Sequence, residues 1–257
     1  MASPLLTPAM SASTQQDRLA VIWIQKAPPH LSKKEFDAKV DALVDSLVAL
    51  PVARKNFMAF KVLYQNNRMD SVLRECGYPE PPVNVVVIAE CETMDNFTEF
   101  ASDEEVKKLL LAAKTSGFQA GACVFAADVN TKIDDPTPAE LNLWVGIYKI
   151  PSHLSRVEFE QKMDALSDDY IAGPLSQKHF VNHSMWKQNS SIARHVQDAG
   201  LPEAEPTVIL MTQAQTWDKL IEVSDNSAGK NVITDAIHDF AVHVNSSCFG
   251  ADVVVKI

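Results

Sequence analysis

The histidines of this chain are unevenly distributed between its two halves. Histidine has its ordinary pKa near neutral pH, which makes it the first candidate for proton transfer. His30 and His153 lie 123 residues apart in similar sequences, whereas the other five histidines all fall in the second half. These five are His179, His183, His195, His238 and His243. The asymmetry favours a functional second half with His183 and His179 as acid–base residues, and the alternative is that each imidazole is solvated or bonded to backbone.

Other side chains of the second half also differ from the residues 123 positions earlier. The differing pairs are Gln25 and Tyr148, Ala59 and Asn182, Lys61 and Ser184, and Leu63 and Trp186. A tyrosine hydroxyl or an asparagine amide can orient a substrate oxygen, and an indole ring can stack on an apolar ligand. We predict a catalytic set of His183, His179 and Tyr148, and a substrate-binding set of Asn182, Trp186 and His243.

The spacing of the histidines argues against a metal site. His179 and His183, four residues apart on a strand, would be separated by roughly 13 Å at about 3.3 Å per residue. That separation is too large for two ligands of one ion. The sequence has no GxSxG, no Gly-rich phosphate loop and no HExxH motif, and it has only 8 glycines. We therefore predict neither a metal nor a cofactor.

The elements that position these residues follow from an internal repeat. A shift of 123 aligns the segment from Ile24 to Ser32 with that from Ile147 to Ser155, and the match continues without a gap to Glu80 and Glu203. Near the end of each half the shift becomes 124. We predict a disordered tail (1–18), a first copy (19–131), a linker (132–140) and a second copy (141–257).

Each copy contains the pattern of a ferredoxin-like, or split βαβ, unit. Strands are expected at 19–25, 57–64, 83–89 and 122–129, and at 141–150, 180–186, 208–212 and 248–256. The first major helix of each copy follows a capping box, Ser32 with Glu35 or Ser155 with Glu158. A short helix ends at Gly77 or Gly200, and a second major helix lies at 102–113 or within 228–240.

A four-stranded sheet covered by helices on one face leaves its other face bare. We therefore predict an α+β fold in which two ferredoxin-like repeats pack sheet to sheet as an intramolecular pseudo-dimeric α+β barrel. Two aspartate pairs at helical i,i+4 spacing, Asp41 with Asp45 and Asp164 with Asp168, are expected to form solvated helix faces.

The sequence resembles the dimeric α+β barrel superfamily, and more narrowly its EthD-like branch. The matching residues are Lys26 or Lys149 at the end of the first strand, Pro28 or Pro151 after it, the Leu-Ser and Glu-Phe pairs that open the first helix, and Pro51 or Pro174. No residue here matches the histidine that EthD-like members usually carry on this helix. The resemblance implies a cofactor-independent cyclase or dehydratase, of the lyase or isomerase kind, that holds a small hydrophobic oxygenated substrate in a cleft between helices and sheet.

Two alternatives to this function remain. A non-catalytic stress-response or interaction protein would fill the same cleft with its own side chains. A haem-binding member of the superfamily would use one axial histidine, for which His195, His238 and His243 are the candidates.

The composition excludes several other classes. Of the 257 residues, 46% are hydrophobic, which suits folded domains rather than disorder. The formal net charge of -10 opposes nucleic acids and anionic membranes. No apolar run reaches the roughly 20 residues of a membrane-spanning helix, and four dispersed cysteines indicate free thiols in a reducing compartment. We predict a cytoplasmic monomer whose partner is a small hydrophobic ligand.

Overall fold

The structure is a computed structural model that describes residues 13–14, 18–115, 117, 121–135 and 142–257. The predicted N-terminal tail lies mostly outside these residues, as do residues 136–140 of the predicted linker. No helix in the described part of the chain is long and apolar enough to cross a membrane.

The elements alternate along the chain much as the sequence periodicity predicts. The first half contains β1 (Ser13–Thr14), β2 (Leu19–Lys26), α1 (Lys33–Val48), α2 (Pro51–Asn56), β3 (Phe57–Asn66), α3 (Asp70–Glu75), β4 (Asn84–Cys91), α4 (Met94–Ser102), α5 (Glu104–Thr115) and β5 (Ala122–Asp134). The second half contains β6 (Asn142–Lys149), α6 (Arg156–Ala172), α7 (Pro174–His179), β7 (Phe180–Asn189), α8 (Ala193–Asp198), β8 (Thr207–Ala214), α9 (Trp217–Asp225), α10 (Ser227–Phe240) and β9 (Ser247–Val255).

Local signals in the sequence set the ends of several helices. Both predicted capping boxes are confirmed. The Ser32 and Ser155 hydroxyls accept hydrogen bonds from the backbone N–H groups of Glu35 and Glu158, and the carboxylates of these glutamates accept from the backbone N–H groups of the two serines. Gly77 and Gly200 follow α3 and α8 with positive φ angles of 91° and 69°. Glycine adopts this left-handed conformation without the steric cost that a Cβ brings, which is why both short helices end there.

The strands form one closed barrel, so the predicted fold is wrong. Eight long strands run in the order β5-β2-β4-β3-β9-β6-β8-β7, and β7 pairs again with β5. All of these pairings are antiparallel. Two ferredoxin-like sheets packed face to face would leave the β3, β9, β5 and β7 edges apart. Instead β3 pairs with β9 and β5 pairs with β7 along their lengths, because an unpaired edge leaves backbone donors and acceptors unsatisfied.

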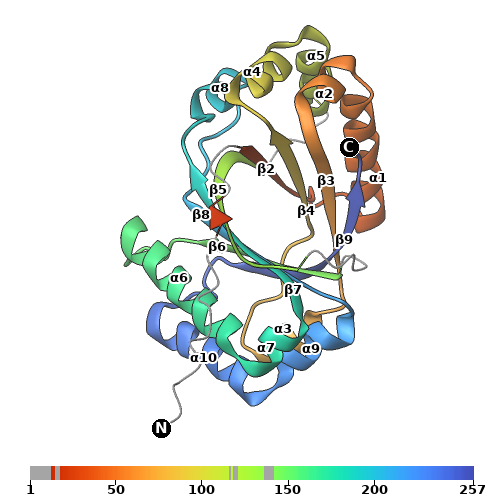
Figure 1. Ribbon diagram of the computed structural model, residues 1–257. Helices are drawn as coiled ribbons and strands as arrows, with labels where there is room; N and C mark the ends of the chain where they lie inside the picture. The colour runs from red at the N-terminus through yellow and green to blue at the C-terminus, as the bar shows by residue number, and fades with distance from the viewer. Residues whose placement is uncertain (1–12, 15–17, 116, 118–120, 136–141) are drawn as a thin grey trace.

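Strand alternation divides the core into three layers. Inside the barrel pack Ile22, Val86, Phe125, Val145 and Phe249, all nearly or fully buried. Outside it, two further hydrophobic clusters join the strands to the helices. Figure 1 shows one group of helices, including α1, α2, α4 and α5, on one side of the barrel, and a second group with α6, α7, α9 and α10 on the other.

Two short helices pack on the half to which they do not belong. Met69, Val72 and Leu73 at α3 lie in the cluster formed by the second half. Ile192 and Val196 at α8 lie in the cluster formed by the first half. In Figure 1, α8 accordingly lies beside α4, and α3 lies beside α9. The two halves of the chain are thus interlocked through helices as well as through strands.

Candidate functional site

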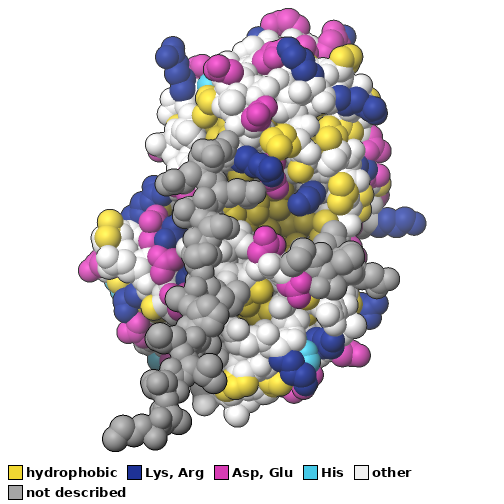
Figure 2. All heavy atoms as spheres, viewed as in Figure 1, with side chains coloured by type: hydrophobic (Ala, Val, Ile, Leu, Met, Phe, Trp, Pro, Cys, Tyr) yellow, Lys and Arg dark blue, Asp and Glu magenta, His cyan; other side chains and the backbone are white. Residues whose placement is uncertain are grey.

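A cavity of about 310 Å³ lies inside the barrel near one of its ends. This volume is at the lower end of the range typical of small-molecule pockets. Both halves of the chain contribute to it, and Figure 2 shows hydrophobic side chains gathered in a hollow between the two helical groups. The apolar lining consists of Ala20, Leu63, Ile88, Val129, Leu143, Met211 and Val253.

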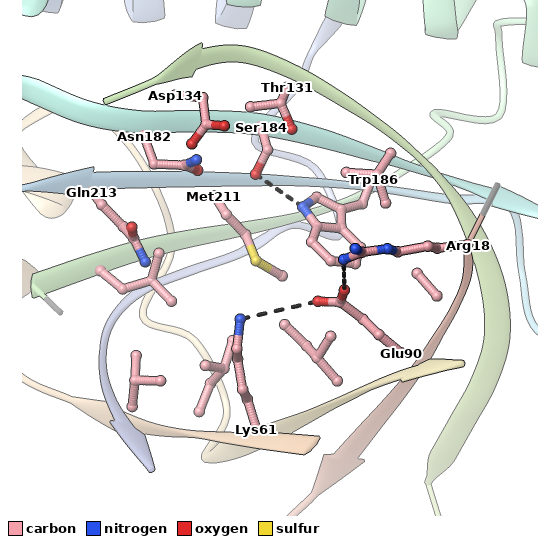
Figure 3. A pocket seen from close by; sticks show the side chains of 16 residues that line it. Arg18, Lys61, Glu90, Thr131, Asp134, Asn182, Ser184, Trp186, Met211 and Gln213 are labelled. Atoms are coloured by element: carbon pink, nitrogen blue, oxygen red, sulfur yellow. Dashed lines mark hydrogen bonds and ion pairs between the residues drawn. The ribbon is translucent and has the colours of Figure 1, made fainter. Parts of the chain in front are cut away.

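One wall of the cavity carries three charged side chains. Glu90 of β4 lies between Arg18, which precedes β2, and Lys61 of β3 (Figure 3). Each of the two cation–carboxylate distances is 4.0 Å. A direct charge-assisted hydrogen bond is about 2.7–2.9 Å long. Both cations therefore retain N–H groups that can donate hydrogen bonds to an additional oxygen atom. With two cations and one carboxylate, the wall has a formal charge of +1.

The opposite wall carries a row of polar side chains from three neighbouring strands. Asp134 of β5 pairs in register with Asn182 of β7, and Asn182 pairs with Gln213 of β8. All three line the cavity. Within the described residues, none of their side chains makes a hydrogen bond to another protein group. The row thus offers a carboxylate and two carboxamides to whatever occupies the cavity.

Trp186 gives the same wall an aromatic surface. Its indole Nε1–H donates to the Ser184 hydroxyl at 3.0 Å, which fixes the ring on β7. Trp186 is 8% exposed to solvent and Ser184 is 5% exposed. Because the polar edge of the indole is already satisfied, its face is left to stack on an apolar ligand.

Two of the predicted site residues meet in this cavity, and four do not. Asn182 and Trp186 line it together. His183 lies between them in sequence and therefore points to the opposite face of β7, towards α6. There its two ring nitrogens lie 2.8 Å from the Ser167 and Thr212 hydroxyls. Burial lowers the pKa of His183 to about 3, so its imidazole is neutral near pH 7.

Tyr148 also lies outside the barrel lumen. It is 1% exposed, and its hydroxyl is 3.4 Å from that of Tyr78 and accepts from the Cys248 thiol at 3.5 Å. Burial raises the pKa of Tyr148 well above its ordinary value. The cleft predicted between sheet and helices is occupied at this point by the protein's own side chains.

The remaining histidines are dispersed. His179 on α7 lies 3.4 Å from the Glu222 carboxylate without hydrogen-bond geometry. His243 lies in the turn before β9. His195 contacts Thr98 of α4 through its Nε2 at 3.2 Å. None of these imidazoles lines the barrel cavity. The catalytic role predicted for His183, His179 and Tyr148 stays a prediction, as does the binding role of His243.

Sequence reasoning missed the charged wall. Arg18, Lys61, Glu90, Asp134 and Gln213 were not predicted as site residues. A signal was present, because Lys61 and Ser184 differ at positions 123 residues apart. The sequence shows this difference only as a serine in the second half where the first has a lysine. It does not show that both positions face one lumen.

A metal site and a second cavity are weaker candidates for the functional site than the barrel cavity. No group of three or more His, Cys, Asp or Glu side chains in the described residues could hold a metal ion. A second cavity, of about 270 Å³, lies among α6, α7, α9 and α10 and is lined mainly by apolar and small residues. The barrel cavity is the better candidate because polar groups with free hydrogen-bonding capacity converge on an apolar lining.

Comparison of the sequence with family models and with curated proteins finds no match. Solved structures do resemble the fold. An anthrone oxidase-like protein matches with a TM-score of 0.56 and 12% identity, over 95% of this chain and 94% of that one. A Fusobacterium nucleatum subsp. nucleatum protein described as a "putative monooxygenase" matches with a TM-score of 0.54 and 7% identity, over 94% of each chain.

At these identities the likeness is one of fold. Membership of the dimeric α+β barrel superfamily therefore stays a prediction. The relationship to the EthD-like branch and the internal duplication stay predictions.

Proposed function

We propose that this protein binds a small, largely apolar, oxygenated molecule inside the barrel. The observation that carries the proposal is the lumen cavity, in which an aromatic face and an aliphatic lining meet three polar side chains, Asp134, Asn182 and Gln213, that bond no other side chain in the described part of the protein. Such a combination of apolar walls and a few convergent polar groups is typical of ligand sites. The names of the two structural neighbours, anthrone oxidase-like protein and monooxygenase, agree with a substrate of this kind.

The finer proposal is cofactor-independent proton transfer, as a cyclase, dehydratase or isomerase requires. Glu90 is the proton acceptor we favour, because Lys61 and Arg18 beside it could stabilise the oxyanion that forms when the ligand loses its proton. In the step we propose, the carboxylate takes a proton from a carbon that is conjugated with a carbonyl, as the methylene carbon of anthrone is through its aromatic rings. The electron pair of the broken C–H bond is delocalised onto the carbonyl oxygen, so that the ligand becomes an enolate whose oxygen faces the two cations.

The geometry supports Glu90 more strongly than the imidazoles. His183 is fully buried, and both of its nitrogens are occupied by hydroxyl groups. The filled layer between sheet and helices would, taken by itself, favour the non-catalytic alternative. The open lumen favours ligand binding, and it shifts the proposed site from the helix-to-sheet cleft to the barrel interior.

Anthrone is a suitable test ligand, since it is a compact aromatic ketone with acidic methylene protons. We expect it to quench the fluorescence of Trp186, and we expect the protein to accelerate anaerobic exchange of those protons with D2O, followed by NMR. Trp186→Leu, which introduces the residue found at position 63, should weaken binding by about tenfold or more because the stacking surface is lost. Glu90→Gln should keep binding and lose the exchange.

Trp23→Leu is the matched control, because Trp23 belongs to a helix-facing cluster outside the lumen. It should leave anthrone binding unchanged. Undiminished binding in Trp186→Leu, or no binding by the wild type, would contradict the lumen site. Exchange that persists in Glu90→Gln would contradict the assigned proton acceptor.

A further inference from the structure

We infer that the ligand has two different polar ends: an oxyanion or carbonyl that faces Arg18 and Lys61, and a hydroxyl group that faces Asp134, Asn182 and Gln213. This inference rests on the proposed lumen site and names its ligand class, a hydroxylated aromatic or alicyclic acid or ketone. It is carried by the juxtaposition of two chemically different polar walls across one apolar cavity (Figure 3).

The first wall selects an electron-rich oxygen. Lys61 and Arg18 offer only donors. Both line the cavity, and their side chains are 39% and 44% exposed. At 4.0 Å from each cation, Glu90 balances one of the two charges without saturating their N–H groups. A carboxylate, an ionised phenol or a carbonyl oxygen is the group that completes this wall.

The second wall selects a hydrogen-bond donor. Asp134 offers acceptors only when it is ionised, and it would repel a second anionic group on the ligand. Asn182 and Gln213 each add a donor and an acceptor to the same row. A neutral hydroxyl can donate to the carboxylate and accept from an amide, whereas a carboxylate cannot donate at all. The row therefore favours a hydroxyl over a second acid group.

The difference between the walls lies at corresponding positions of the two halves. Glu90 pairs with Ala20 and Ala59, and Gln213, 123 residues later, pairs with Leu143 and Asn182, which are also 123 residues later. The same offset relates Lys61 to Ser184 and Leu63 to Trp186. All of these positions except Ala59 line the one cavity. The two walls thus occupy related positions of the barrel, but one carries two cations beside a carboxylate and the other carries a carboxylate, two carboxamides and an aromatic ring, as a ligand with unlike ends requires.

Four naphthalene probes test this assignment by titration calorimetry. They are 6-hydroxy-2-naphthoate with both groups, 2-naphthoate with the acid, 2-naphthol with the hydroxyl, and 2,6-naphthalenedicarboxylate with two acids. We expect the hydroxy acid to bind about tenfold more tightly than either singly substituted probe. The dicarboxylate should bind more weakly than the hydroxy acid, and Asp134→Asn should reduce that difference.

Variants of each wall should affect one end of the ligand only. Lys61→Met should weaken both monoacids about tenfold and leave 2-naphthol unchanged. Asn182→Ala, which introduces the residue at position 59, should weaken the two hydroxylated probes and leave 2-naphthoate unchanged. Glu90→Gln should strengthen binding of 2-naphthoate by about two- to fivefold, because a competing carboxylate is removed.

Lys108→Met and Asn231→Ala, at exposed positions on α5 and α10, are the matched controls and should change no affinity. If all four probes bind alike and neither wall variant discriminates between them, the assignment of the two ends is wrong while the lumen site stands. If no probe binds, the proposed function itself is wrong. Weaker binding of 2-naphthoate to Glu90→Gln would also overturn the role assigned to the first wall.

Discussion

At the scale of single residues, position within a strand decides whether a polar side chain is available for chemistry. His183 and its neighbours Asn182 and Ser184 are adjacent in sequence, yet His183 packs under α6 while the other two face the lumen. Its ring lies parallel to that of Phe180, with a centroid distance of 6.3 Å. A histidine enclosed by two hydroxyls and an aromatic ring is a stabilising core residue in its neutral form.

The lowered pKa of His183 predicts a specific pH dependence of stability. An unfolded histidine titrates near pH 6.5, whereas folded His183 does so at about 3. Between these values the unfolded state binds one more proton, so the free energy of unfolding falls as the pH falls, by up to about 1.4 kcal/mol per pH unit. The stability that the neutral, buried His183 provides is therefore fully present above pH 6.5 and decreases below it.

Urea unfolding of the wild type and His183→Phe between pH 4 and 7.5 measures the effect. The variant, which introduces the residue at position 60, leaves two buried hydroxyls without a partner and should be less stable at pH 7 by about 1–3 kcal/mol. It should also show a flatter pH dependence while retaining anthrone binding. His153→Gln, at an exposed position, is the control. An unchanged slope in His183→Phe would contradict the assignment.

At the scale of elements, lysines of one half bind aspartates of the other. Lys256 after β9 lies 2.6 Å from both Asp41 and Asp45 of α1. Lys132 of β5 lies 2.5 Å from Asp168 of α6 and 3.9 Å from Asp164. The aspartate pairs lie on solvated helix faces as expected, with side chains 36% to 63% exposed. They also join the helices of each half to a strand of the other, near the two seams that close the barrel, the β3–β9 and β5–β7 pairings.

Loss of either lysine should weaken its seam. Lys256→Met leaves Asp41 and Asp45 as a like-charged pair and should lower the free energy of unfolding by about 1–2 kcal/mol, between the values for exposed and buried ion pairs. The hydrogen bond from Lys256 lowers the pKa of Asp41, so the stabilisation is present above the ordinary aspartate pKa near 4 and is lost as the pH falls through the lower folded value.

Hydrogen exchange should localise this effect. Amides of β9 and of its partner β3 should exchange faster in Lys256→Met than in the wild type, whereas those of β5 and β7 should not. Lys55→Met removes an ion pair whose side chains are 65% and 47% exposed, so it should destabilise the protein less than Lys256→Met does. Equal stability losses in the two variants would show that the lysine–aspartate contacts across the seams have no special role.

At the scale of the whole molecule, the two halves do not form separable units. Two strand pairings, two exchanged helices and the lysine–aspartate contacts cross between them. Separating the halves would expose four strand edges and the apolar lumen. The predicted monomeric state stays a prediction.

This interlocking predicts a single cooperative unfolding transition of the intact chain. The calorimetric enthalpy should equal the van't Hoff enthalpy, because neither half keeps its core when the other unfolds. Lys132→Met and Lys256→Met should shift the transition without splitting it. Two resolved transitions, in the wild type or in either variant, would indicate two independent domains.

The sequence alone determined most of the elements, because their signals are local. Capping boxes at Ser32 and Ser155, positive-φ glycines at 77 and 200 and periodic apolar residues predicted the eight long strands and the helices α1, α3, α5, α6, α8 and α10 close to their observed bounds. The helices α2, α4, α7 and α9 were not predicted. The difference between the halves at positions 59, 61 and 63 was also visible, and it drew attention to Asn182 and Trp186, which line the barrel cavity.

Only the tertiary structure decided how the sheet closes and where the cavity lies. Which strand edges pair depends on backbone hydrogen bonds between residues up to about 190 positions apart, such as Lys61 with Val255, and side-chain patterns do not encode such edges. Which face of β7 is open depends in turn on closure, since the same alternation of residues fits a lumen on either side. The sequence analysis predicted a site in the cleft between sheet and helices, whereas closure of the barrel leaves the cavity on the other face of β7, beside Asn182 and Trp186 and away from His183.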